Sequence, residues 1–306
     1  MFISDAIQQF LEHCEIEKNQ SKRTLISYQH YLERFLGFAD DIELDQITLN
    51  LVKKFRLHLN RYEFKPKETL SVKTQNYHMI ALRAFLKFCA KNDWNTLAPE
   101  KVDLSKIEER TVEYLTRDEL ERLFEAVDIR KITGLRNRAI LEMLYSTGLR
   151  ISELVNLDRG HVNLERGEFH VRGKGQKVRI VFLSKRAIEW IKEYLNERDD
   201  GFDPLFLNHG RTREKDPDHM DLKGEHRRLT AYSIQEMVRT TALLAGITKH
   251  VTPHTLRHSF ATELLLNGAD IRSVQDMLGH ASITTTQIYT HITNSKLREI
   301  HEKFHR

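Results

Sequence analysis

The sequence has few cysteines and no long hydrophobic run. Its two cysteines, Cys14 and Cys89, fall on apolar helical stripes and are expected to be core thiols. It has neither a disulfide framework nor a Cys or His spacing typical of a metal site, which suits a reducing cytoplasm. No apolar stretch approaches the ~18 residues that a membrane span needs, and residues Met1 to Asp5 lack the basic and apolar regions of a signal peptide. We therefore expect a cytoplasmic protein with no membrane partner and no bound metal.

An excess of charge of one sign is also lacking. The 48 Lys and Arg residues nearly balance the 44 Asp and Glu residues, which leaves a net charge of +4. This balance alone does not indicate a nucleic-acid partner, and a DNA-binding chain of this composition must gather its basic side chains on one face. The chain has 306 residues, of which 40% are hydrophobic, so it is long enough for two domains with separate cores.

Residues 1–94 are predicted to form a small bundle of four amphipathic helices. Each expected helix follows a side chain that can cap it and continues with apolar residues at helical spacing. The four caps are Ser4, Ser21, Thr48 and Ser71. The apolar stripe of the fourth helix is Tyr77, Ile80, Ala81, Ala84, Phe85 and Phe88.

The polar faces of the second and fourth helices carry many basic side chains. Such side chains can lie along DNA phosphates, although an ordinary solvated face has the same composition. The basic residues of both faces are Lys22, Arg23, His30, Arg34, Lys73, Arg83, Lys87 and Lys91. The proposed DNA contacts among them are Lys22, Arg23, Lys73, Arg83 and Lys87.

A lapse in periodicity over residues 95–112 predicts an interdomain linker. The domain that follows, residues 113–306, is expected to be rich in helices, and its first helix opens with a capping box at Thr116 and Glu119. The period changes to two at residues 168–171 and 178–182, which predicts two strands around a glycine-rich turn with Lys174 at its tip. The fold class is therefore mainly α with a small antiparallel β-sheet.

A polar segment at residues 208–229 is predicted to be a long surface loop. Its basic residues make it a candidate DNA-contacting flap, whereas its interleaved acidic residues favour a solvated insertion equally. The basic residues are Arg211, Arg213, Lys215, Lys223, Arg227 and Arg228.

Several short segments of the second domain hold residues suited to phosphate chemistry. Thr252 and Pro253 predict a helix start, which places His254 in the first turn and Arg257 on the same face. A helix N-terminus with an imidazole and a guanidinium suits a phosphate. The phenol of Tyr289, with an ordinary pKa of ~10, becomes a nucleophile only beside a base or concentrated positive charge. The side chains that would supply this charge are Arg150, Lys174, His254, Arg257 and His280.

Each of these residues has a simpler interpretation. Single histidines and tyrosines near helix ends are mostly structural. His254 and His258 are four residues apart, but no Glu follows His254 and no third ligand is evident, which argues against zinc. The turn around Lys174 lacks the spacing of a P-loop. The combination of all these residues in one order along one domain carries more information than any of them alone.

In this order the residues resemble the catalytic signature of the tyrosine recombinase (phage integrase) family, and its Xer-type members in particular. The signature is Arg, Lys, His-x-x-Arg, His or Trp, and Tyr. The matching positions are Arg150, Lys174, His254, Arg257, His280 and Tyr289. The stretches 278–282 and 289–291 are similar in their surrounding residues, and residues 21–38 resemble the family's core-binding, SAM-like domain. The insertion at 208–229 is longer than a simple Xer protein would have.

The resemblance implies a site-specific recombinase that cleaves and rejoins double-stranded DNA through a 3′-phosphotyrosine at Tyr289, without a metal or cofactor. It implies a homotetramer on two duplexes in the nucleoid, acting alone, with a second recombinase or under an activator. The apolar stripe Leu297, Ile300 and Phe304 would dock on a neighbouring protomer or pack on its own domain. Glu153 would orient Arg150 or His280, unless it forms only a surface salt bridge.

The biological task is expected to be chromosome dimer resolution or the integration and excision of mobile DNA, and the sequence does not separate these. Two other functions stay open at this point. A type IB topoisomerase would share the tyrosine chemistry, although the N-terminal half argues against it. A DNA-binding accessory protein without catalysis should have lost at least one of the six signature residues, and none is lost here.

Overall fold

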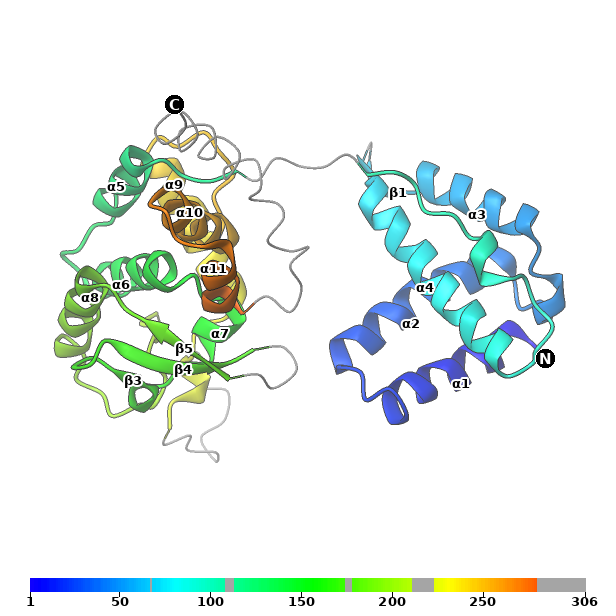
Figure 1. Cartoon of the computed structure of the whole chain (residues 1–306), viewed down its shortest axis with the longest axis horizontal. Coiled ribbons are helices and arrows are strands. Elements are labelled where there is room, and N and C mark those ends of the chain that lie inside the picture. The colour runs from blue at the N-terminus through cyan, green and yellow to red at the C-terminus, as the bar shows by residue number, and fades with distance from the viewer. Residues whose placement is uncertain (67, 108–112, 174–177, 211–222, 280–306) are drawn as a thin grey trace, which may run out of the picture. The chain divides into compact units, whose positions relative to one another are not determined.

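The structure, a computed structural model, describes residues 1–66, 68–107, 113–173, 178–210 and 223–279. The chain divides into two compact units, Met1–Arg110 and Thr111–Arg306 (Figure 1). Each unit buries a hydrophobic core of its own. The division between them falls inside the linker expected at residues 95–112.

The first unit contains the four predicted helices, and a short antiparallel hairpin that was not predicted. The helices are α1 (Ile3–Ile16), α2 (Lys22–Ala39), α3 (Leu49–Arg61) and α4 (Val72–Lys91). The hairpin strands are β1 (Glu63–Lys65) and β2 (Glu68–Thr69). A core of aromatic and aliphatic side chains lies between the helices, with Phe35 and Phe55 in edge-on contact at a centroid distance of 5.1 Å.

Three of the four predicted caps are confirmed. The hydroxyls of Ser21, Thr48 and Ser71 each accept a hydrogen bond from the backbone N–H three residues on, at 3.2–3.3 Å. The prediction for Ser4 is wrong, because α1 begins at Ile3 with Phe2 as its N-cap. Ser4 instead donates from its N–H (2.9 Å) and its hydroxyl (2.7 Å) to the carboxylate of Asp41, which ties α1 to the loop after α2.

The predicted apolar stripe of α4 is partly wrong. Tyr77 and Ile80 are 42% and 41% exposed. The side of α4 that faces the core includes polar residues instead. Their hydrogen bonds offset the free-energy cost of burying them. Gln75 donates to the carbonyl of Leu70 at 2.8 Å, and His78 donates from Nδ1 to the carbonyl of Thr74 at 2.9 Å. The buried residues of α4 are Gln75, Asn76, His78, Met79, Ala81, Leu82, Phe85, Leu86 and Cys89.

The first half of the expected linker packs on the first unit. Val102 is fully buried in that core. The guanidinium of Arg83 donates from Nε to the carbonyl of Val102 at 2.9 Å, and Asn76 and Ser105 exchange two hydrogen bonds of 2.8 and 2.9 Å. Residues 95–105 are therefore part of the first unit.

The second unit combines helices with one small sheet. Its helices are α5 (Arg117–Glu125), α6 (Ile132–Thr147), α7 (Ile151–Val155), α8 (Lys185–Asn196), α9 (Ala231–Leu244), α10 (Pro253–Leu266) and α11 (Ile271–Leu278). The strands β3 (Val162–Asn163), β4 (Glu168–Arg172) and β5 (Val178–Phe182) form an antiparallel sheet in the order β3-β4-β5. The two predicted strands and the capping box of Thr116 and Glu119 are confirmed, as is the fold class.

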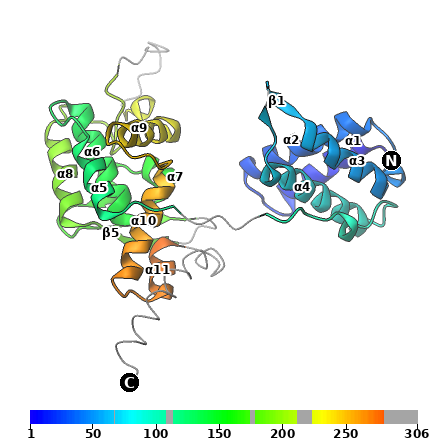
Figure 2. The same cartoon turned by 90° about the horizontal axis from the view of Figure 1, so that it is seen from above.

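Helix α6 lies at the centre of the second unit. Ile140, Leu141, Met143 and Leu144 are fully buried, so this helix is apolar on more than one face, as a core helix must be. It packs against α8, α10 and β5. Figures 1 and 2 show α11 beside α10, and both views agree with their contacts. This arrangement brings the ends of α6 and α11 close to the beginnings of α7 and α10.

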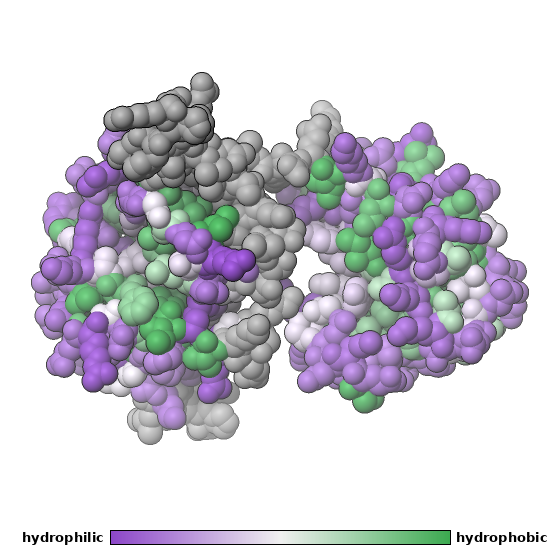
Figure 3. Space-filling model, in the orientation of Figure 1, coloured by the Kyte–Doolittle hydropathy of each residue, from purple (hydrophilic) through white to green (hydrophobic). Residues whose placement is uncertain are grey.

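The faces of the two units that Figure 3 shows are mostly hydrophilic, with several small apolar patches. This follows from a composition in which 30% of the residues are charged. None of the described helices is both long and apolar enough to cross a membrane.

Candidate active site

The site begins at the turn between α6 and α7. Gly148 ends α6 in the left-handed conformation, with φ of +59°. A Cβ atom at this position would lie 2.6 Å from the ring of Phe260 and 2.9 Å from Leu278, so any other residue would be strained here and would force these side chains to move. The tight turn makes Arg150 the N-cap residue of α7 and brings its side chain to the end of α11.

Arg150 is held at both ends by hydrogen bonds. Its backbone N–H donates to Oε2 of Glu153 at 2.8 Å, and its Nη1 donates to Oε1 of the same carboxylate at 3.0 Å. Its Nη2 donates to the carbonyl of Gly279 at 3.0 Å. The side chain of Glu153 is only 6% exposed, which excludes the alternative of a surface salt bridge.

The start of α10 carries the second pair of predicted residues. Thr252 caps the helix by accepting from the N–H of Thr255 at 3.2 Å, and Pro253 is its first residue, as predicted. Arg257 is buried, with 4% exposure. Its guanidinium donates to the carbonyl of Gly148 and, at 2.7 Å, to the carbonyl of Leu278.

His254 lies on the same helix and is exposed at its surface. The pKa of its imidazole is lowered from the ordinary value, first by the protein atoms packed around the ring and then by the positive charges of Arg257 and Arg150. The imidazole is therefore neutral at neutral pH and able to accept a proton.

Arg150, His254 and Arg257 are thus brought together, although they lie on α7 and α10. The two guanidiniums reach the same short stretch, Leu278 and Gly279, at the end of α11. The other predicted catalytic residues, Lys174, His280 and Tyr289, lie outside the described residues. His280 directly follows Gly279 in the sequence.

Arg179 belongs to this cluster, although it was not predicted from the sequence. Its Nη1 and Nη2 donate to both oxygens of Glu153, at 2.9 and 2.8 Å, and its side chain is 10% exposed. Alternation along β5 places Arg179 on the same face as buried Val181. A buried arginine needs an acidic partner. The inward-facing position of Arg179 in a predicted strand could therefore have indicated a buried ion pair.

The Glu153 carboxylate is ionised. Burial alone would raise the pKa of Glu153, but hydrogen bonds from Arg179 and Arg150 outweigh this effect and lower the pKa below its ordinary value.

The proposed DNA-contacting residues of the first unit differ in their surroundings. Lys22, Arg23, Lys73 and Lys87 are exposed. Arg83 is half-buried with its guanidinium on the Val102 carbonyl, a contact that favours a structural role over the predicted phosphate contact.

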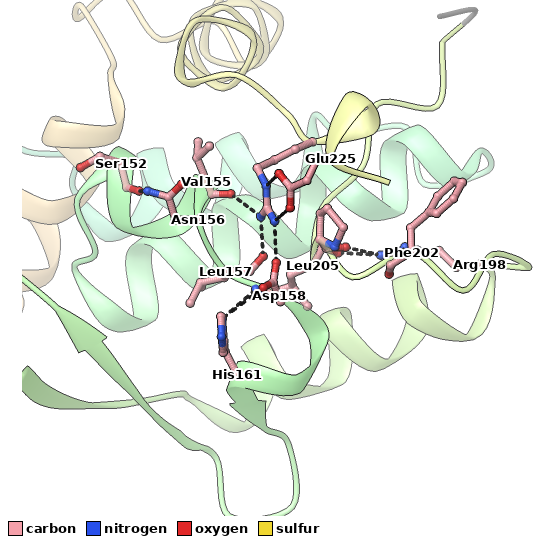
Figure 4. A network of polar contacts seen from close by, with 12 residues as sticks. Ser152, Val155, Asn156, Leu157, Asp158, His161, Arg198, Phe202, Leu205 and Glu225 are labelled. Carbon is pink, nitrogen blue, oxygen red and sulfur yellow. Dashed lines mark hydrogen bonds and ion pairs between the residues drawn. The ribbon is translucent and has the colours of Figure 1, made fainter. Parts of the chain in front are cut away.

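Two basic residues of the 208–229 segment are also structural. Arg227 donates to the carbonyl of Gly210 at 2.9 Å. Arg228 donates to the carbonyls of Val155 and Leu157 at 2.9 and 3.1 Å and to Asp158 at 2.6 Å, in the network that Figure 4 shows. Arg228 therefore fastens the end of the segment to the body of the second unit, whereas Arg227 joins that end to the start of the same segment. Arg211, Arg213 and Lys215 lie outside the described residues, and Lys223 is inside them.

No group of three or more His, Cys, Asp or Glu side chains in the described part of the chain is arranged to hold a metal ion.

Comparisons with known proteins cover both units. The phage integrase family matches residues 113–296, and the phage integrase SAM-like domain matches residues 4–104. The chain is 36% identical to tyrosine recombinase XerD of Oceanobacillus iheyensis over 98% of each chain.

Two solved structures extend these comparisons. The XerH site-specific recombinase bound to its palindromic difH substrate, in a post-cleavage complex, is 26% identical with a TM-score of 0.71. That match covers 96% of this chain and 83% of XerH. The Tn1549 transposon integrase in complex with transposon right end DNA has a TM-score of 0.76 at 20% identity and full coverage of both chains, which shows the same fold.

Proposed function

Since the chain belongs to the phage integrase family and is a site-specific tyrosine recombinase, we propose that it cleaves and rejoins double-stranded DNA through a 3′-phosphotyrosine bond to Tyr289. The proposed catalytic residues are Arg150, Lys174, His254, Arg257, His280 and Tyr289. The observation that carries this proposal is the meeting of two guanidiniums, from α7 and α10, at the residues just before His280.

The two arginines would bind the non-bridging oxygens of the scissile phosphate. A guanidinium has five N–H donors in a planar fork that fits two phosphate oxygens. The contacts of Arg150 with Glu153 and Gly279 use two of these donors, so others remain for the phosphate. Charge builds up on the phosphate oxygens in the transition state, so fixed cations there supply most of the acceleration. His280 would donate one more hydrogen bond to the same phosphate.

The proton transfers would be divided between two residues. The phenol of Tyr289 attacks phosphorus while neutral His254 takes its proton, and the bond from phosphorus to the 5′-oxygen breaks as Lys174 protonates that oxygen. The covalent intermediate keeps the energy of the phosphodiester. The 5′-hydroxyl of a partner duplex can then attack the phosphotyrosine and release Tyr289, which completes strand exchange without ATP.

We propose that the recombination serves chromosome dimer resolution or the integration and excision of mobile DNA, the two tasks that the sequence does not separate. We propose that the protein forms a homotetramer on two duplexes in the nucleoid of the cytoplasm. This homotetramer acts alone, with a second recombinase or under the control of an activator. The apolar stripe Leu297, Ile300 and Phe304, outside the described residues, would link neighbouring protomers. A chain that ends at Asn294 should then stay smaller than the full-length chain when both are sized on DNA.

A nicked suicide substrate tests the proposed nucleophile. Loss of the short strand beyond the nick traps the covalent protein–DNA adduct, which migrates slowly in a denaturing gel. The wild-type enzyme should form the adduct and Tyr289→Phe should form none. Tyr232→Phe, a change at a tyrosine that is 71% exposed, is the matched control and should keep the adduct. An adduct with Tyr289→Phe would contradict the proposal.

A second assay separates recombination from simple relaxation. A type IB topoisomerase would relax supercoiled plasmid of any sequence, whereas this enzyme should join two plasmids only when both carry its site. Relaxation that does not depend on the site, with no joined product, would favour the topoisomerase.

A further inference from the structure

One carboxylate of the second unit is shared by two arginines from different elements. Oε1 of Glu153 accepts from Nη1 of Arg150 at 3.0 Å and from Nη1 of Arg179 at 2.9 Å. Oε2 accepts from the backbone N–H of Arg150 and from Nη2 of Arg179, both at 2.8 Å. Each oxygen therefore takes one bond from the start of α7 and one from β5.

This sharing fixes the plane of the carboxylate. Arg179 grips both oxygens with the two parallel bonds of its fork, the most directional arrangement that an arginine can make. Without Arg179, the carboxylate would be held only by the backbone N–H and the Nη1 of Arg150. These two donors are not part of one planar fork, so the carboxylate would be freer to rotate. The orientation of the Arg150 guanidinium thus depends on a carboxylate that Arg179 holds in place.

Arg179 has a third contact, which reaches the end of α11. Its Nε donates to the carbonyl of Met277 at 3.0 Å. Gly279 has a positive φ of +64°, and a Cβ atom on it would lie 3.1 Å from Cδ and Nη1 of Arg179. The backbone that receives the Nη2 bond of Arg150 therefore lies directly against the Arg179 side chain.

The charges of this cluster favour the same division of roles. Two guanidiniums face one carboxylate, so Arg150 keeps net positive charge for an incoming phosphate. The side chain of Arg150 is 29% exposed, whereas those of Arg179 and Glu153 are 10% and 6% exposed. Arg150 is thus the accessible member, and the other two lie behind it.

We propose that Arg179 is a positioning residue of the recombination reaction. Its fork holds Glu153, and its Nε holds the end of α11, so that Arg150 meets the scissile phosphate in a fixed orientation. Arg179 does not touch the phosphate itself. This inference rests on the proposed function, because it requires Arg150 to be a phosphate ligand.

Single-turnover cleavage of the suicide substrate, with enzyme in excess at saturating concentration, tests the proposal. Arg179→Ala should slow adduct formation about 10- to 100-fold, the usual effect of removing a residue that orients a site ligand. Its affinity for DNA in a gel-shift assay should stay within about threefold of wild type, because Arg179 lies behind Arg150. Arg166→Ala, an exposed arginine in the turn between β3 and β4, is the matched control and should cleave at the wild-type rate. An Arg179→Ala enzyme that cleaves at the wild-type rate would overturn the inference.

A double-mutant cycle tells positioning from a general loss of structure. In an enzyme that already carries Glu153→Gln, the further change Arg179→Ala should slow cleavage much less than it does in the wild-type enzyme, because only the Nε bond to the Met277 carbonyl is still lost. If the two rate losses multiply, Arg179 does not act through Glu153 and the inference is wrong. Should Arg179→Ala fail to fold, as judged by circular dichroism, Arg179→Lys replaces it in the same cycle, because lysine keeps the charge and loses the fork.

A substrate with a 5′-bridging sulfur separates two routes of action. A thiol has a pKa of ~8.5, so a thiolate leaves without the acid that an alkoxide needs. If Arg179 acts through Arg150, Arg179→Ala should stay about as slow, relative to wild type, on this substrate. Recovery to the wild-type rate would mean that Arg179 acts through the turn that carries Lys174, and would overturn the inference. A wild-type enzyme that forms no adduct on either substrate would contradict the proposed function instead.

Discussion

At the scale of the residue, Arg257 has two tasks that can be measured separately. It would bind the scissile phosphate, and its buried guanidinium joins the carbonyls of Gly148 and Leu278. Arg257→Ala should therefore slow cleavage about 10²–10³-fold, as for the loss of one transition-state donor. It should also lower the melting temperature, because two buried carbonyls lose their donor.

A matched control for that change is Arg239→Ala. Arg239 is an exposed arginine of α9 that pairs with Glu236 one turn away. This variant should keep both the cleavage rate and the melting temperature. Equal effects of the two substitutions would contradict the roles given to Arg257.

His209 makes the stability of the second unit depend on pH. Burial, followed by the nearby charges of Arg136 and Arg198, lowers the pKa of His209 to about 4. Its Nε2 lies 2.9 Å from the hydroxyl of Tyr194, which also accepts a bond from the N–H of Leu207. The hydroxyl of Tyr194 can therefore donate its proton to Nε2 of neutral His209.

The sign of this effect follows from proton binding. Between pH ~6.5 and about 4 the unfolded chain binds a proton at His209 and the folded chain does not, so stability falls as pH falls through this window. His209→Gln keeps an acceptor and does not titrate, so its melting temperature should change less than that of the wild type between pH 7 and pH 4.5. An unchanged pH dependence would contradict this role.

Single residues also show where prediction from sequence ends. The signature residues could be named because each combines a reactive side chain with a recognisable neighbour, as Pro253 marks the helix start before His254. Arg179 was missed because its partner, Glu153, lies 26 positions earlier in the chain. Local patterns do not report contacts over that separation.

At the scale of the element, the turn between α6 and α7 decides where Arg150 lies. Gly148→Ala should destabilise the second unit by about 1–2 kcal/mol from the left-handed backbone alone, with a further loss from the close approach to Phe260 and Leu278. Cleavage should fall as well, because Arg150 follows two residues later. Differential scanning calorimetry and the suicide substrate measure the two effects.

Gly160→Ala is the control for that substitution. Gly160 has nothing within 4 Å of its hypothetical Cβ and no positive φ. It should therefore leave both the melting temperature and the cleavage rate unchanged. Comparable losses at the two glycines would refute the argument from the turn.

Elements were predictable where one periodicity or one cap dominates the local sequence. The strands around Lys174 and the caps at Ser21, Thr48 and Ser71 are of this kind. The stripe of α4 was not, because its buried face includes polar side chains whose partners lie elsewhere, such as Asn76 with Ser105. Sequence periodicity alone does not distinguish a satisfied buried amide from an exposed one.

At the scale of the whole molecule, the resemblance of both halves to recombinase domains is confirmed. The predicted linker was too long. Charged residues surround Val102 in the sequence, so the pattern did not indicate that Val102 is buried in the first core. The Arg228 contacts explain how the end of a long polar segment can be fixed to the second unit although the composition of the segment resembles that of a loop.

DNA affinity of the full chain should distinguish the exposed lysines from Arg83. Each phosphate contact releases a bound counterion, so Lys87→Ala should reduce the slope of log affinity against log salt by about 1. Arg83→Ala should leave that slope unchanged and lower the melting temperature, since Arg83 holds the Val102 carbonyl. Fluorescence anisotropy with labelled duplex at several salt concentrations gives both slopes. The opposite pattern would reassign Arg83 to the DNA interface.

The central claim is that cationic side chains of the second unit surround one phosphate that Tyr289 attacks. Mass spectrometry of the trapped adduct, after digestion with trypsin and nuclease, tests it most directly. The tryptic peptide 273–296 contains Tyr289 as its sole tyrosine. This peptide should carry a nucleotide linked through its 3′-phosphate. A nucleotide on any other peptide would show that Tyr289 is not the nucleophile, and a 5′-linkage would show that the opposite bond of the phosphate is cleaved.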